Sequence, residues 1–216
     1  MPVLVTGGRS FVEVHASEKQ TCGRTSTGKV FCWGAQVGGA DATDCFSPSV
    51  PMCTRVPLLQ VGGALFTGIA LGDTYRCGTR ADHTAACWGF DAFGLFGNGS
   101  TTQFSSDTLV VAAGGNTYEA IAFGRNHACG MNAGALECWG QNAVGEAGGQ
   151  VGVAHRTPAA IGGITFASVW ASPVADRTCG IAATSRAYCW GEGFFGQLGN
   201  GTAGSTGQPV EVKLVR

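Results

Sequence analysis

The stretch "HACGMNAGALECWG", residues 127–140, places two cysteines nine positions apart and ends in Cys-Trp-Gly. The same three-residue ending occurs three more times along the chain, at residues 32–34, 87–89 and 189–191. The tryptophans of successive Cys-Trp-Gly copies are 55, 51 and 51 residues apart. A period of about 50 residues is typical of propellers and solenoids. The repeat therefore decides the fold class before any single residue does.

Other landmarks recur in phase with this ending. Each repeat opens with a glycine pair and an aromatic residue three positions later: Gly7-Gly8 with Phe11, Gly62-Gly63 with Phe66, Gly114-Gly115 with Tyr118, and Gly162-Gly163 with Phe166. Short runs with the alternation of β-strands follow, namely "VEVHA", "TGIAL", "EAIAF" and "ASVWA". A Cys-Gly pair comes next in every repeat. No stretch keeps a helical period, and glycine is too frequent for long helices.

The pattern predicts an all-β fold, a β-propeller built of four repeats of about 51–55 residues, each a four-stranded blade with its own disulfide. The predicted repeats cover residues 2–56, 57–107, 108–156 and 157–207 of a single domain, 1–216, followed by an extra terminal strand at 208–216. We expect each tryptophan to be a core residue of its blade or of the contact between blades.

A glycine, His127, Cys-Gly, a turn, Cys-Trp-Gly and "GQLGNGT" (residues 196–202) together resemble the regulator of chromosome condensation repeat family, over essentially the whole chain. The resemblance implies a β-propeller, which has seven blades in the best-known members. The eukaryotic namesake exchanges nucleotide on a small GTPase and docks on chromatin, and neither activity is carried over here because a basic surface is missing. This chain has four repeats and keeps the histidine once, with Gln20, Tyr75 and Arg177 at the matching places.

Every repeat also has a second cysteine, which points to a disulfide-rich, extracellular and bacterial variant of the family. Eight of the ten cysteines fall at two places per repeat, and these are separated by nine or ten positions. Such separations fit hairpins with two- or three-residue turns, whose opposed strands bring the sulfur atoms into bonding range. The predicted pairs are Cys22–Cys32, Cys77–Cys87, Cys129–Cys138 and Cys179–Cys189, and a fifth pair, Cys45–Cys53, closes a loop found only in the first repeat.

Two other interpretations of the cysteines remain open at this point. A zinc site favours C-x₂-C pairs, of which the sequence has none, and His127 is the only histidine beside a cysteine. Buried free thiols explain one cysteine but not a matched pair in four repeats. Five bridges would place the protein in an oxidising compartment, outside the cell or at its surface.

The sequence contains no catalytic motif of the serine hydrolase, zinc protease or nucleotide-binding kind. Its four histidines occupy different phases of the repeat, and we expect His127 to bond backbone within its blade. Asp41 and Asp44 form an incomplete calcium loop. Asn98 and Asn200 are formal acceptors for N-glycosylation. We therefore predict no catalytic, cofactor-binding or metal-binding residues, no cofactor, and a protein that is not an enzyme.

Composition excludes further classes of protein. Charged residues make up 12% of the 216 residues and the net charge is −1, so the chain has no electrostatic footprint for nucleic acid. No apolar run reaches the length of a membrane-spanning helix, so no membrane insertion is expected. The first ten residues lack the pattern of a signal peptide, which is expected either of a processed chain or of a piece of a longer one.

One strand motif occurs five times for only four Cys-Trp-Gly cores, at residues 2–5, 56–61, 108–113, 157–161 and 208–215. A surplus strand could pair with the open edge of a neighbouring subunit and build a ring or a filament; an array cut between blades would show the same count. We therefore predict a non-catalytic, extracellular, self-assembling scaffold that joins subunits through its terminal strands. The alternative is a secreted or surface module that recognises protein or glycan through loops between blades.

Overall fold

The computed structural model describes residues 4–5, 7–35, 53–72 and 74–213. These residues form sixteen strands in four antiparallel sheets, which we call blades one to four. Blades one and two comprise β1 (Glu13–Ala16), β2 (Gln20–Arg24), β3 (Val30–Ala35), β4 (Cys53–Leu59), β5 (Phe66–Leu71), β6 (Tyr75–Arg80), β7 (Ala85–Asp91) and β8 (Phe104–Val111). Blades three and four comprise β9 (Ala120–Phe123), β10 (His127–Asn132), β11 (Ala135–Gly140), β12 (His155–Ile161), β13 (Phe166–Ala171), β14 (Arg177–Ala182), β15 (Ala187–Gly191) and β16 (Thr206–Glu211).

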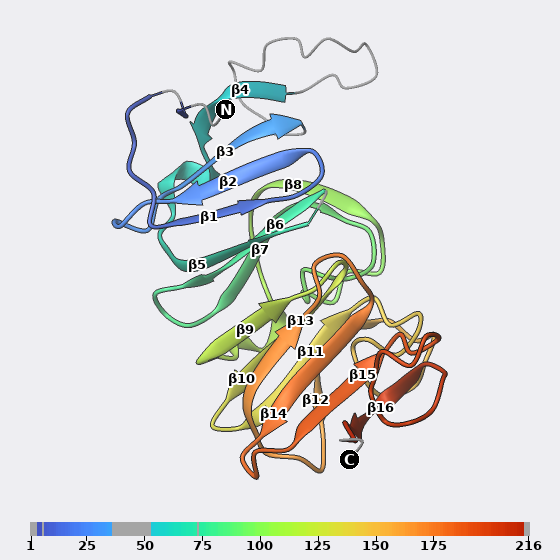
Figure 1. Ribbon diagram of the computed structural model, residues 1–216. Coiled ribbons are helices and arrows are strands. Elements are labelled where there is room, and N and C mark those ends of the chain that lie inside the picture. The colour runs from blue at the N-terminus through green and yellow to red at the C-terminus, as the bar shows by residue number, and fades with distance from the viewer. Residues whose placement is uncertain (1–3, 6, 36–52, 73, 214–216) are drawn as a thin grey trace.

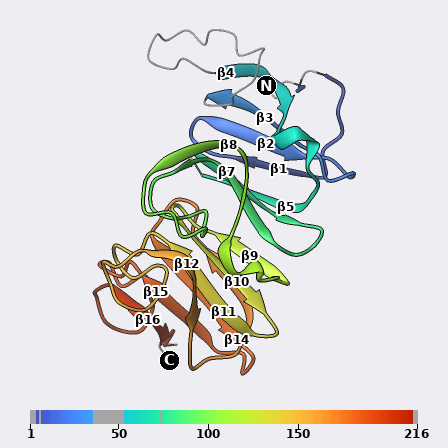
Figure 2. The same cartoon turned by 180° about the vertical axis from the view of Figure 1, so that it is seen from behind.

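The predicted all-β architecture of four four-stranded blades is confirmed. In each blade the strands lie side by side in chain order, so every blade is built from one continuous segment. Two short 3₁₀ turns, Val61–Gly63 and Ala113–Gly115, follow the first and second blades. Blade one lies at one end of the molecule and blade four at the other (Figures 1 and 2).

The segment expected as an extra terminal strand has a different place. Residues 206–211 form β16, which pairs with β15 in register Cys189↔Val210 and completes blade four. The corresponding copies of the motif form the fourth strands of the other blades. The copy without a Cys-Trp-Gly core is therefore the one at residues 2–5, of which Leu4 and Val5 lie in no strand.

The glycine of each Cys-Trp-Gly is required by the backbone. Gly140 has a φ of 102°, and the register of β11 against β12 shifts between Cys138 and Gly140, which is a β-bulge. A Cβ atom at Gly140 would lie 2.5 Å from the carbonyl oxygen of Asn126. The bulge brings the strand against the preceding turn, and only glycine fits there.

The hairpins that hold the cysteines have the predicted lengths. Ala133 and Gly134 form a two-residue turn with φ values of 49° and 81°, as a type I′ turn requires. In blades one and two the turns have three residues, and the last of them, Gly28 and His83, has a positive φ. These turns place the two cysteines of each blade directly opposite each other.

Three apolar clusters lie in the described part of the chain, each between consecutive blades. We call each of these contacts a junction. At every junction, one blade supplies its cysteine pair, and the next blade supplies its tryptophan and the aromatic residue that follows its glycine pair. Between blades three and four, for example, Cys129 and Cys138 lie in one cluster with Phe166 and Trp190. Trp88, Trp139 and Trp190 are thus core residues of the contacts between blades.

Candidate functional site

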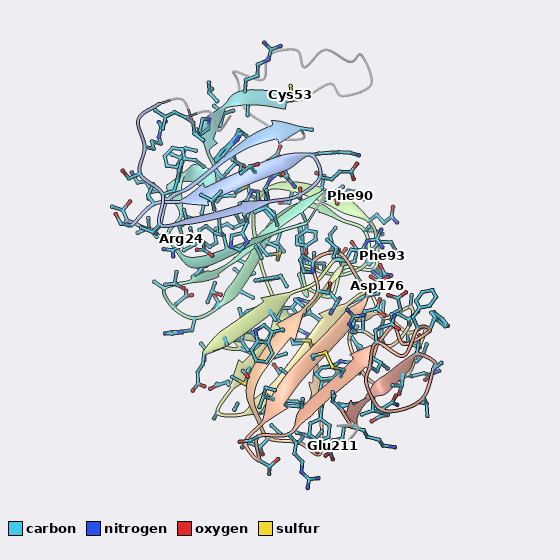
Figure 3. The ribbon with its side chains drawn as sticks, in the orientation of Figure 1. Arg24, Cys53, Phe90, Phe93, Asp176 and Glu211 are labelled. Atoms are coloured by element: carbon cyan, nitrogen blue, oxygen red, sulfur yellow. A yellow bond between two sulfur atoms is a disulfide. The ribbon has the colours of Figure 1, made fainter. Side chains whose placement is uncertain are left out.

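The four blades each contain the predicted disulfide, with Cα atoms 4.0 to 4.1 Å apart: Cys22–Cys32, Cys77–Cys87, Cys129–Cys138 and Cys179–Cys189. These eight cysteines are therefore neither free thiols nor thiolate ligands of a metal. Cys53 opens β4 (Figure 3). Its sulfur is disulfide-bonded. Cys45, its predicted partner, lies outside the described residues, so the Cys45–Cys53 pair stays a prediction.

The remaining polar candidates do not converge on one centre. Asn98 and Asn200 are half-buried and lie in loops of different blades, where each side-chain oxygen accepts a hydrogen bond from the backbone two residues on. Their glycosylation stays a prediction. Asp41 and Asp44 lie outside the described residues. Within the described ranges no three His, Cys, Asp or Glu side chains gather as metal ligands would.

From the sequence we expected the side chain of His127 to hydrogen-bond to backbone within its own blade. The structure shows a different partner. His127 is fully buried at the junction of blades three and four, and its Nε2 lies 2.8 Å from Oγ1 of Thr178 in the next blade. The Thr178 hydroxyl donates to the carbonyl of Glu146, so it accepts from His127 Nε2–H. Nδ1 is then an unprotonated nitrogen without a partner among the described groups. Burial lowers the pKa of His127 to about 4.

In blades one and two, the side chain at the position of His127 also makes a hydrogen bond across the junction to the next blade. Gln20 donates to the carbonyl of Gly72 in blade two, and the Tyr75 hydroxyl donates to the carbonyl of Gly124 in blade three. The side chains of Gln, Tyr and His differ in chemical type, but each is long enough to reach the next blade and can donate a hydrogen bond. Aligning the repeats identifies the position of His127 but not its hydrogen-bond partner, because the partner belongs to the following repeat.

The tryptophans add polar contacts to two of the junctions. Trp139 Nε1 donates to the carbonyl of Leu95, in the loop after β7 of the preceding blade, at 2.8 Å. Trp88 Nε1 approaches Oε1 of Gln60, just after β4, at 3.4 Å. Each tryptophan therefore contacts the outer part of the blade before it.

The first strands of all four blades surround a cavity of about 480 Å³ on the axis of the propeller. His15, Ala70, Ala122 and Trp170 occupy the same position on β1, β5, β9 and β13, and all four line this cavity. Trp170 is 55% exposed. The polar side is formed by Glu13, which lies 2.9 Å from His15 Nε2 and 2.6 Å from Arg24 Nε. Partial burial acts to raise the pKa of Glu13, but the hydrogen bonds from Arg24 and His15 hold it below its ordinary value.

The two ends of the chain's row of blades each expose half of a junction. Blade one presents Phe11, Val14 and Trp33, which we call the first-blade face. Val14 is 55% exposed, whereas Ile69 at the same position in blade two is 6% exposed because blade one covers it. The rings of Phe11 and Trp33 pack against each other at a tilt, with centroids 5.9 Å apart.

Blade four presents the opposite half, made of Arg177, the Cys179–Cys189 bridge and Ala187, which we call the fourth-blade face. All of these except Cys189 are half-buried, whereas their counterparts at the three junctions are buried. The loop after β15 carries Phe194 and Phe195, and Phe195 is 90% exposed. Two apolar surfaces of complementary composition are thus left uncovered within one chain.

This architecture defines a class, the β-propeller whose blades pack through one tryptophan each. The family model of the regulator of chromosome condensation (RCC1) repeat matches residues 185–216. The chain is 27% identical over 193 residues to the ultraviolet-B receptor UVR8 of Arabidopsis thaliana, an alignment that covers 81% of this chain and 40% of UVR8. The chain is therefore similar to RCC1 repeat proteins, and each of its blades carries a disulfide.

Solved structures share this fold. Human WBSCR16 aligns with a TM-score of 0.76 and 16% identity, over 98% of this chain and 55% of that protein. Yeast RCC1 (Prp20), solved bound to Kap60, aligns with a TM-score of 0.75 and 19% identity, over 98% of this chain and 50% of that protein. The chain therefore spans about half the length of these relatives or less. No helix in the described part of the chain is long and apolar enough to cross a membrane.

Proposed function

We propose that this protein is a non-catalytic scaffold of an oxidising, extracellular environment, and that copies of the chain associate with one another. The observation that carries the proposal is the pair of uncovered faces at the two ends of the row of blades. Phe11, Val14 and Trp33 at one end lie at positions that the repeat uses for contacts between blades. At the other end, Phe194 and Phe195 are exposed apolar side chains in the outer loop of blade four. Exposed apolar surface of this kind marks protein–protein contact.

The disulfides support the proposal that the protein works in an oxidising, extracellular environment. Each described blade carries its own bridge, and structural disulfides form and persist in oxidising surroundings. A bridge in every blade also suits a protein that must persist without cellular repair. Among the described residues, β16 is paired within blade four and is not a surplus strand. Association in this proposal therefore runs through blade faces.

The test is the mass of the purified protein in solution across a concentration series, by size-exclusion chromatography with light scattering. We expect species larger than one 22.0 kDa chain, in proportions that rise with concentration. A chain that stays monomeric at its solubility limit, with its disulfides intact, would refute self-association.

The axial cavity favours a second function, the binding of a glycan. A cavity that holds an exposed tryptophan together with a carboxylate and a histidine offers an apolar platform and hydrogen-bonding groups, and Trp170, Glu13 and His15 all line this one. A glycan array with wild type and Trp170→Ala tests it. Binders that are lost in the variant would support a binding module, and an array without binders would exclude this function.

A further inference from the structure

We infer that a second copy of this chain docks head to tail, with the fourth-blade face of one copy on the first-blade face of the next. The contact would reproduce the junction that the chain already makes three times. This inference rests on the proposed self-association and adds the surfaces, the polarity and the register of the contact.

The three internal junctions define what each side supplies. The preceding blade contributes its disulfide and one apolar residue at the start of its third strand: Val30, Ala85 and Leu136. The following blade contributes an aromatic residue, a residue of its first strand and its tryptophan. At the first junction these are Phe66, Ile69 and Trp88. The same interface is thus built from different residues three times, so it tolerates substitution while keeping its layout.

Both halves of a fourth such junction are present on one chain. Phe11, Val14 and Trp33 occupy the positions of Phe66, Ile69 and Trp88 and are more exposed than these counterparts. On blade four, Ala187 stands where Val30 stands in blade one, beside the Cys179–Cys189 bridge. A second copy therefore offers, at each of these positions, the residue type that the internal junctions use.

The polar contact of the junction has a matching donor as well. Arg177 occupies the position from which Gln20 and Tyr75 donate to a carbonyl of the next blade. Those carbonyls belong to Gly72 and Gly124, and the corresponding residue of blade one is Ser17. Arg177 of one copy would thus approach the carbonyl of Ser17 in the next.

The outer loop of blade four fits the same register. In the loops of blades two and three, Gly94 lies against Arg156 and Gly145 against Gly207, so each loop covers the fourth strand of the next blade. The backbone amides of Gly99 and Gly149 also donate to that strand. The equivalent loop of blade four carries the 90% exposed Phe195. In a head-to-tail contact this loop would cover β4 of the second copy.

A head-to-tail contact has two different surfaces, which separates it from a two-fold contact between identical surfaces. Each copy added leaves one face of each kind, unless the row closes into a ring. A variant blocked at one face therefore keeps the other face available. Mixing two variants that are blocked at different faces therefore distinguishes a head-to-tail contact from a two-fold one.

The test uses Val14→Asp on the first-blade face and Ala187→Asp on the fourth-blade face. Each aspartate would be buried without a partner in the contact, so we expect the dissociation constant of each pure variant to rise by about 100-fold or more. An equimolar mixture should form a dimer of two 22.0 kDa chains and nothing larger, because each variant retains the face that the other lacks. Val151→Asp, at an exposed valine of blade three, is the matched control and should assemble like wild type.

Circular dichroism and thermal unfolding of each variant keep the test interpretable, because both positions are partly exposed and the isolated chains should stay folded. If wild type associates but both variants associate equally well, or if the mixture remains monomeric, the head-to-tail contact is wrong while self-association stands. If wild type itself is a monomer, the proposed function fails and the inference fails with it.

Discussion

Gly140 shows how a single residue holds the blade pattern in place. Its φ of 102° and the 2.5 Å approach of a Cβ to the Asn126 carbonyl leave no room for a side chain. We predict that Gly140→Ala lowers the free energy of unfolding by about 1–3 kcal/mol. Gly68→Ala is the control, because Gly68 has no positive φ and its Cβ would meet open space. Chemical denaturation measures both, and an equal effect of the two changes would contradict the prediction.

The buried His127 makes the stability of the fold depend on pH. Its pKa is about 4 in the folded chain and about 6.5 when unfolded, so the unfolded state binds the proton first as the pH falls. We predict that this residue costs up to about 3 kcal/mol of stability between pH 6.5 and pH 4. Burial raises the pKa of the neighbouring Glu146 and Asp176, and these carboxyls add stability as the pH falls.

A matched variant separates the two effects. His127→Gln removes the titrating ring and introduces the residue that blade one carries at the same position, Gln20. Unfolding curves at pH 7 and pH 4.5 should show a larger loss for wild type than for the variant. If both lose the same free energy, His127 is not the source of the acid sensitivity.

At the scale of elements, the disulfides differ in what covers them. Cys129–Cys138 packs against Trp190 of blade four, whereas Cys179–Cys189 lies on the uncovered fourth-blade face. Replacing either pair by alanine should cost about 2–3 kcal/mol through chain entropy, because the two loops have nearly equal lengths. We predict about 1 kcal/mol more for the internal pair, from lost packing at the junction. Equal losses in denaturation experiments would contradict this.

The same difference predicts the order of reduction. Cys129 and Cys138 are fully buried, while Cys179 is partly exposed. Because thiolate attack requires access to a sulfur atom, a mild reductant should open Cys179–Cys189 before Cys129–Cys138. Timed alkylation and peptide mass spectrometry would establish the order, and simultaneous opening of both pairs would indicate global unfolding instead.

The sequence predicted most elements because strands, turns and cysteine pairs are local features. The nine-residue spacing of Cys129 and Cys138 gave the two-residue turn, and the type I′ geometry of Ala133 and Gly134 is its direct consequence. The fourth strand was assigned to the wrong repeat, because a repeating pattern has no intrinsic starting point. Only the hydrogen bonds of β16 with β15 show where a blade ends.

At the scale of the whole molecule, blades two and three are covered on both sides and blades one and four on one side each. We predict that amide hydrogen exchange is slowest in β6, β7, β10 and β11. If copies associate head to tail, raising the protein concentration should slow exchange in β1–β3 and β14–β15 and leave blades two and three unchanged. Protection that is uniform at every concentration would contradict this prediction.

The sequence could not predict the junctions or the uncovered faces. A tryptophan recurring every 51–55 residues indicates a core position, but the residues it contacts belong to the preceding repeat. The partner of His127 was missed for the same reason, since Thr178 lies 51 positions away. The axial cavity is assembled from four first strands and has no signature within any one of them. Local patterns thus describe blades, and only the fold describes how they meet.

Each blade is made from one uninterrupted segment of chain, with its strands hydrogen-bonded in the order of synthesis. A duplication or deletion of one repeat in the gene would therefore leave the sheet of every other blade intact. The joining surfaces would also be preserved, because each repeat carries both kinds. Such a protein can lengthen or shorten by whole repeats during evolution without passing through a misfolded intermediate.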